Sequence, residues 1–126
     1  MREVLLVALG GAIGATARYA MSGYILHHTI QNKFPYGTFA VNVIGCLFAG
    51  LLVGVAEKHH LVSAEARLFL LTGILGGFTT FSAFGVETIY LLRRGDVLVA
   101  CSYVAFSVAC GLAALWLAYS SISVKE

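Results

Sequence analysis

Four long apolar runs constrain the fold of this sequence more than any other feature. They cover residues 4–26, 38–56, 68–92 and 97–118, and the only Lys, Arg, Asp or Glu residues inside them are Arg18 and Glu87. A membrane-spanning helix needs about 20 mostly apolar residues. With 60% hydrophobic and only 11% charged residues, the composition excludes a soluble domain of this size. We therefore expect an all-α integral membrane protein, a single domain of residues 1–126 with four transmembrane helices.

Several other assignments are disfavoured by the same pattern. Arg2 and the apolar stretch after it partly fit a signal peptide, but Arg18, the apolar turn that follows it and three further spans favour a retained helix. Cys46, Cys101 and Cys110 fall inside predicted spans without a CxxC pattern, which indicates neither a zinc site nor a disulfide framework. The net charge of +2 does not indicate a nucleic-acid partner.

The positive charges divide evenly between the two sides of the predicted bundle. One side, with both termini and the second connector, carries Arg2, Lys58, Arg67 and Lys125. The other side carries Arg18, Lys33, Arg93 and Arg94. An excess of Lys and Arg in short cytoplasmic loops normally sets orientation, so an even tally leaves no strong preference. We expect both orientations and an antiparallel dual-topology homodimer, equivalent to an inverted repeat; chance balance among few charges is the alternative.

The third apolar run carries a pattern that predicts a helix broken in mid-membrane. Residues 73–84 read GILGGFTTFSAF, two adjacent glycines followed by hydroxyl residues. Each glycine lowers helix stability by about 1 kcal/mol relative to alanine, and Thr79 or Thr80 is suited to cap a restarted helix. Carbonyls freed before the break can hold a cation, and the new N-terminus favours an anion. The alternative is an unbroken helix whose hydroxyls bond to carbonyls one turn earlier.

Individual polar residues inside the spans also need an explanation in lipid. Asn42 brings a side-chain amide with two donors, which needs partners when it is buried. Arg18 must either snorkel or pair, which makes it a site candidate. Glu87 can pair with a neighbour or face water, and Tyr103 and Ser107 share one face of the last helix.

Small and aromatic residues recur at helical spacing. Phe81 and Phe84 share a face, which indicates either core packing or ring edges, the positive part of the aromatic quadrupole, facing a small anion. GxxxG pairs let helix backbones approach closely and by themselves indicate packing. They are Gly10 with Gly14 and Gly50 with Gly54.

Three blocks of this sequence together resemble the Fluc (CrcB) fluoride channels over essentially the whole chain. They are residues 11–19, GAIGATARY; residues 37–45, GTFAVNVIG; and residues 73–84 followed by Glu87 and Thr88. The third block is close to diagnostic in a four-span chain, whereas the first alone is weak. The resemblance implies a dual-topology homodimer in the lipid of the bacterial plasma (inner) membrane. Its two antiparallel pores would export cytoplasmic fluoride passively, around a structural sodium ion (Na+) at the dimer centre.

The resemblance also implies roles for particular residues. The backbone carbonyls of Gly76 and Thr79 match the sodium ligands, two from each subunit. Phe81 and Phe84 match phenylalanines whose ring edges line the fluoride path, and Asn42 matches the amide that donates to the ion. Further matches are the pore-lining residues Thr38, Ser82, Tyr103 and Ser107 and the pore-mouth charges Arg18 and Glu87.

Two departures and three rival functions accompany the resemblance. Ala83 stands where similar members often carry Thr or Ser, and Phe78 replaces a commonly smaller aliphatic residue.

A small dual-topology multidrug exporter would need an embedded acid, for which Glu87 lies far along the third span. An intramembrane enzyme would need a nucleophile and a base, and Ser82 has no evident base. A non-transporting assembly subunit is the third rival; we expect a channel and no enzyme.

Overall fold

The computed structural model describes residues 1–59 and 62–123, and these residues form helices and short connectors without any strand. The first, second and fourth spans are α1 (Arg2–Thr29), α2 (Tyr36–His59) and α6 (Val97–Ser123). The third consists of α3 (Ala64–Arg67), the π-helix η1 (Leu68–Leu75), α4 (Gly76–Phe78) and α5 (Phe81–Arg93). Four of these stretches are long and apolar enough to cross a membrane, which confirms the all-α prediction with four spans. Lys125, counted in the charge tally, lies outside the described residues.

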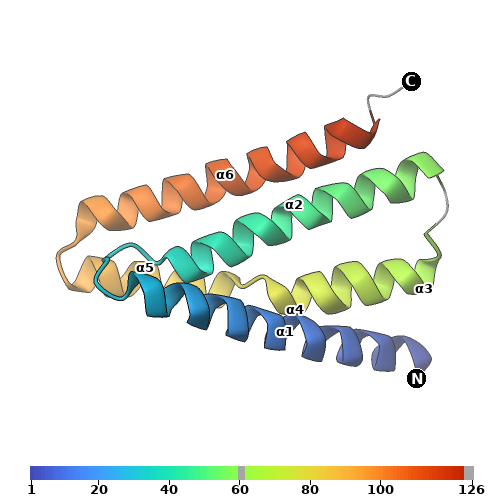
Figure 1. The fold of residues 1–126 in the computed structure, drawn as a ribbon, viewed down its shortest axis with the longest axis horizontal. Helices are drawn as coiled ribbons and strands as arrows, with labels where there is room; N and C mark the ends of the chain where they lie inside the picture. Colours follow the sequence, from blue (N-terminus) through green and yellow to red (C-terminus); the bar gives the residue numbers. More distant parts are fainter. Residues whose placement is uncertain (60–61, 124–126) are drawn as a thin grey trace.

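The two ends of the bundle differ in what they contain. Figure 1 shows that α1 begins, α2 ends, α3 begins and α6 ends at one end, while the connectors after α1 and α5 lie at the other. This is the arrangement that four successive spans predict. The helix α2 packs along α6, and α1 packs along η1 and α4.

Glycines set the close approach of the helices. A Cβ added to Gly10 would lie 2.7 Å from the carbonyl oxygen of Phe69, and one added to Gly77 would lie 2.5 Å from the carbonyl oxygen of Gly11. Real Cβ atoms essentially never come this close to another heavy atom, so α1 reaches the third span only because no side chain intervenes. Gly50 gives α2 the same kind of approach to α6.

An ion-paired cluster joins the two connectors at the far end. The ammonium of Lys33 lies 2.6 Å from one carboxylate oxygen of Asp96, and Nε of Arg94 lies 3.5 Å from the other. Gly95, between Arg94 and Asp96 in the sequence, has a φ of 81°, a left-handed conformation that favours glycine. The hydrogen bond from Lys33 is the main cause that lowers the pKa of Asp96 below its ordinary value, so the carboxylate is ionised at neutral pH.

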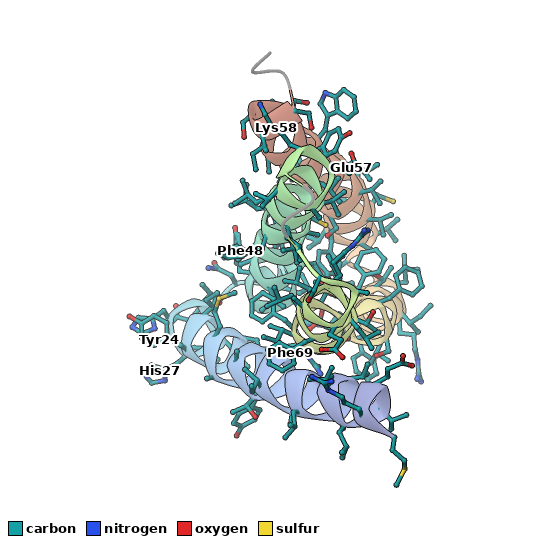
Figure 2. All side chains as sticks on the ribbon, turned by 90° about the vertical axis from the view of Figure 1, so that its right-hand side faces the viewer. Tyr24, His27, Phe48, Glu57, Lys58 and Phe69 are labelled. Carbon is teal, nitrogen blue, oxygen red and sulfur yellow. The ribbon has the colours of Figure 1, made fainter. Side chains whose placement is uncertain are left out.

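Much apolar surface stays uncovered on the single chain. Figure 2 shows Tyr24 projecting from α1 away from the other helices, and Phe48 projecting from α2; both are exposed. A groove of about 520 Å³ between α2 and η1–α4 is lined only by apolar residues: Phe48, Leu51, Leu52, Val55, Leu70, Ile74, Leu75 and Phe78. Apolar surface of this extent suits contact with lipid or with another protein surface.

Candidate functional site

The third span is interrupted at Thr79 and Thr80, whose backbone is extended. Their φ and ψ are −80° and 158°, and −150° and 119°. The hydroxyl of Thr80 accepts a hydrogen bond of 3.2 Å from the backbone N–H of Ala83 and so caps α5. The hydroxyl of Thr79 donates to the carbonyl of Leu75 at 2.9 Å, one turn earlier. The capping residue is therefore Thr80, and the depth of the interruption in a bilayer stays a prediction.

The glycine pair lies just before the interruption and is itself helical. Gly76 and Gly77 belong to α4, and the extended residues begin only after Phe78. Gly77 packs against the backbone of α1, whereas a Cβ on Gly76 would meet only the Leu71 carbonyl, at an ordinary 3.7 Å. Gly77 therefore serves the packing of α4 against α1, and Gly76 does not. The extended backbone itself is formed by the two threonines.

The side-chain amide of Asn42 holds the interrupted backbone from the side. Its Nδ2 donates to the carbonyl of Thr80 at 3.0 Å, and its Oδ1 accepts from the backbone N–H of Thr80 at 2.8 Å. The first bond uses one of the two Nδ2 hydrogens, so the second hydrogen stays available. In a continuous α-helix the Thr80 N–H would instead bond to the Gly76 carbonyl, four residues earlier.

The backbone carbonyls around the interruption divide into two groups. Nε of Arg18 donates to the carbonyl of Gly77 at 3.0 Å, so this carbonyl is occupied. The helical donors of the Gly76 and Thr79 carbonyls, the N–H groups of Thr80 and Ala83, are bonded to side chains instead. Both carbonyls predicted to hold sodium, those of Gly76 and Thr79, thus have helical donors that bond to side chains instead.

The chemistry of these carbonyls fits a hard cation. Carbonyl oxygens suit ions such as alkali and alkaline-earth cations, whereas softer metals take thiolate or imidazole. Within residues 1–59 and 62–123, no group of three or more His, Cys, Asp or Glu side chains is placed to hold a metal. A cation at this site would therefore be bound by the backbone of Gly76 and Thr79.

A cavity of about 280 Å³ adjoins the interruption. Its walls come from α2, the interruption itself, α5 and α6: Asn42, Cys46, Thr79, Thr80, Phe81, Phe84, Ser107 and Val108. The Ser107 hydroxyl oxygen is buried and has no hydrogen-bond partner in the described part of the chain. An unpartnered buried hydroxyl is costly unless a ligand or water completes it. The cavity thus brings together the predicted residues Asn42, Phe81, Phe84 and Ser107.

The two phenylalanine rings of this cavity form a short row with the buried ring of Tyr103, which does not line it. The ring centroids of Phe81 and Phe84 are 5.6 Å apart, and those of Phe84 and Tyr103 are 5.1 Å apart. Phe84 is half-buried, whereas the Phe81 side chain is 84% exposed. Ser82 is exposed as well, with its hydroxyl 3.3 Å from that of Thr80, and it is not among the residues lining the cavity. An exposed Phe81 leaves this side of the cavity open in the single chain.

A second polar cluster surrounds the carboxylate of Glu87. The Thr38 hydroxyl donates to one carboxylate oxygen at 2.7 Å, and the Tyr103 hydroxyl donates to the other at 2.7 Å. Tyr103 is fully buried. Two hydroxyl donors on one carboxyl group hold all three side chains in place. Three residues that the sequence predicts one by one are thus one unit.

This Glu87 cluster borders a further cavity of about 420 Å³ that reaches the ion-paired end of the bundle. Thr38 and Glu87 line it together with Lys33 and Arg94 from the connectors. The cavity therefore joins a cationic rim to a carboxylate held by two hydroxyls. The predicted place of Glu87 and Arg18 at pore mouths stays a prediction.

Comparison with known proteins identifies the relatives of this chain. The model of the family described as "CrcB-like protein, Camphor Resistance (CrcB)" matches residues 5–119. The chain belongs to the CrcB family. A relative from Methylobacillus flagellatus, named fluoride-specific ion channel FluC, is 48% identical over 124 residues, which are 98% of this chain and 97% of the relative.

Two other CrcB relatives carry the same name. The protein of Hyphomonas neptunium is 49% identical over 118 residues, covering 93% of this chain and 92% of its own. The protein of Flavobacterium psychrophilum is 43% identical over 116 residues, covering 92% and 93%. All three are named fluoride-specific ion channels, and none of these names denotes an enzyme.

The sequence does not single out two residues that line the cavity of this CrcB chain, Cys46 and Val108, or the contacts between its helices. The absence of a CxxC pattern assigns no site to Cys46, yet Cys46 lines the cavity beside Asn42. Its position four residues after Asn42 on the same helix is the available signal. The bonds from Asn42 to Thr80 and from Arg18 to Gly77 join different helices. No spacing within one helix reveals such contacts.

Proposed function

We propose that this CrcB chain is a fluoride channel that lets cytoplasmic fluoride leave down its electrochemical gradient and so protects against fluoride toxicity. The observation that carries the proposal is the cavity that combines the unpartnered Ser107 hydroxyl with the remaining N–H of Asn42. A small anion that loses its hydration shell needs such donors in a narrow path. The relatives named as fluoride-specific channels, which match nearly the whole chain, support fluoride as the ion.

The phenylalanines supply the second half of the proposed selectivity. Phe81 and Phe84 line the same cavity as the donors. Ring edges carry the positive part of the aromatic quadrupole and can face an anion without a hydrogen bond. The Glu87 cluster with Thr38 and Tyr103 extends the proposed path toward the cavity that Lys33 and Arg94 also line. The pore-lining role of Ser82 rests on the resemblance alone.

The proposed conducting unit is an antiparallel dual-topology homodimer in the bacterial inner membrane. The exposed Phe81 and the apolar groove beside α2 leave a single chain incomplete, and the even charge tally permits both orientations. Gly76 and Thr79 from two chains would provide four carbonyl oxygens for one structural Na+. C-terminal reporter fusions on both sides of the membrane are expected, and reporting from one side only would refute dual topology.

Reconstitution tests the proposed function directly. Liposomes containing the purified protein and loaded with potassium fluoride are treated with valinomycin, and efflux is followed with a fluoride electrode. Fast efflux without a proton gradient, together with no chloride efflux, is expected. No fluoride efflux from a correctly inserted dimer would reject the channel and favour an assembly subunit. Transport of an organic cation that requires a proton gradient would instead revive the exporter alternative.

A further inference from the structure

The break in the third span is held by a side chain from another helix, and this contact has a consequence for cation binding. Asn42 binds both backbone polar groups of Thr80, at 2.8 Å and 3.0 Å. A residue needed only to donate to a passing anion has no need to bond both groups. The amide acts here like a neighbouring peptide unit in a sheet, which accepts and donates along the same backbone.

The bond to the Thr80 N–H decides which carbonyls are available. If this N–H were released, its acceptor in a continuous α-helix would be the carbonyl of Gly76. The helix would then close over the carbonyl that is proposed to bind the cation. Arg18 removes the adjacent Gly77 carbonyl from the set by donating to it at 3.0 Å. Arg18 from α1 and Asn42 from α2 therefore determine which backbone carbonyls remain available to a cation.

We propose that Asn42 is a positioning residue for a carbonyl cation site at the interruption, as well as a lining residue of the anion cavity. This inference rests on the proposed function and deepens it, because one amide then serves both ions. Its Oδ1 keeps the Gly76 carbonyl available, and its second Nδ2 hydrogen is left for the cavity. Because such coupling is reciprocal, a bound cation steadies the amide that faces the anion.

Sodium-dependent stability provides the test. The midpoint of thermal unfolding of the purified dimer is measured against sodium concentration, with N-methyl-D-glucamine maintaining ionic strength. Ligand that binds only the folded state raises this midpoint. For Asn42→Ala we expect the sodium concentration at half-maximal stabilisation to rise at least about tenfold, since both hydrogen bonds that hold the interrupted backbone are lost. Hydrogen exchange at the Thr80 amide should become faster in the same variant.

Two further variants separate positioning from a general loss of structure. Asn42→Asp keeps the acceptor for the Thr80 N–H but loses the donor to its carbonyl, so we expect a smaller shift than with Asn42→Ala. This variant keeps the test decisive if Asn42→Ala does not fold. Ser107→Ala is the matched control, because Ser107 lines the same cavity but has no bond to the interruption within the described residues. Its sodium dependence should equal that of the wild-type protein.

The outcomes distinguish this inference from the proposed function. Unchanged sodium dependence in both Asn42 variants, or an equal shift in Ser107→Ala, overturns the positioning role. The role also fails if sodium does not stabilise the wild-type dimer. If the wild-type protein passes no fluoride while Asn42 still controls sodium-dependent stability, the proposed channel function fails and the positioning role stands.

Discussion

Replacing Gly77 by alanine tests whether α1 and the third span need direct contact between their backbones. A Cβ on Gly77 would lie 2.5 Å from the carbonyl oxygen of Gly11, 3.0 Å from its Cα and 3.1 Å from the backbone nitrogen of Ala15. Since 3.4 Å is the lower limit of ordinary contact, the two helices must separate by about 0.9 Å. All three opposing atoms are backbone atoms, so no side chain can rotate away.

The same contact supplies a control. Gly11 lies on the opposite side, and a Cβ added to it meets nothing within 4 Å in the described part of the chain. Both substitutions gain about 1 kcal/mol of helix propensity. The difference between Gly77→Ala and Gly11→Ala therefore reports the clash alone, and overpacking of this kind costs about 1–3 kcal/mol.

Chemical unfolding followed by circular dichroism, at one protein concentration, measures this difference. Gly77→Ala should be the less stable variant by about 1–3 kcal/mol. It should also conduct less fluoride in liposomes, because separation of the helices lengthens the 3.0 Å bond from Arg18 to the Gly77 carbonyl. Equal unfolding free energies for the two variants would refute the argument and would mean that the glycine pair acts through helix propensity alone.

Three further predictions concern the cavities and the connectors. Phe81→Ile should lower fluoride flux roughly fivefold with the dimer intact in size-exclusion chromatography, since an aromatic edge interaction is worth about 1 kcal/mol; unchanged flux would remove the ring from the path. Tyr103→Phe removes the 2.7 Å bond to Glu87 and should lower the unfolding free energy by about 1.5–3 kcal/mol, whereas wild-type stability would show that the bond contributes nothing. The Asp96 pKa is lowered in the folded state, so its contribution to stability is present above the ordinary pKa and is lost as pH falls through about 4 and below. Asp96→Asn should abolish this acid-dependent part of the unfolding curve, and an unchanged pH profile would contradict the Lys33 pairing.

The sequence predicts the spans well because their signal is local. A run of about 20 apolar residues identifies a spanning helix without knowledge of its neighbours. The end of each helix is less certain, because α1 and α6 continue into polar residues beyond their apolar runs. The π-helix η1 was not predicted, since its residues, Leu68–Leu75, carry no signal that separates it from an α-helix.

The site is predictable in its residues but not in its contacts. Asn42 was singled out because a buried amide needs partners, yet the sequence cannot show that the partner is Thr80, 38 residues away. The resemblance alone points to Thr38, whereas Glu87 and Tyr103 stand out separately as polar residues inside the spans. Only the packing of α2, α5 and α6 brings the three together. A polar residue in a membrane span predicts that a partner exists, whereas only the fold shows which residue that partner is.

The positions at which α1 begins and α6 ends limit how an opposed pair could be encoded in one polypeptide. Because α1 begins and α6 ends at the same end of the bundle, a short linker joining two copies would force both to insert in the same direction. A tandem gene product with opposed halves would need an additional spanning helix, or any other odd number of crossings, between them. If this chain forms the proposed opposed pair, two separately inserted molecules are therefore the simplest way to form it.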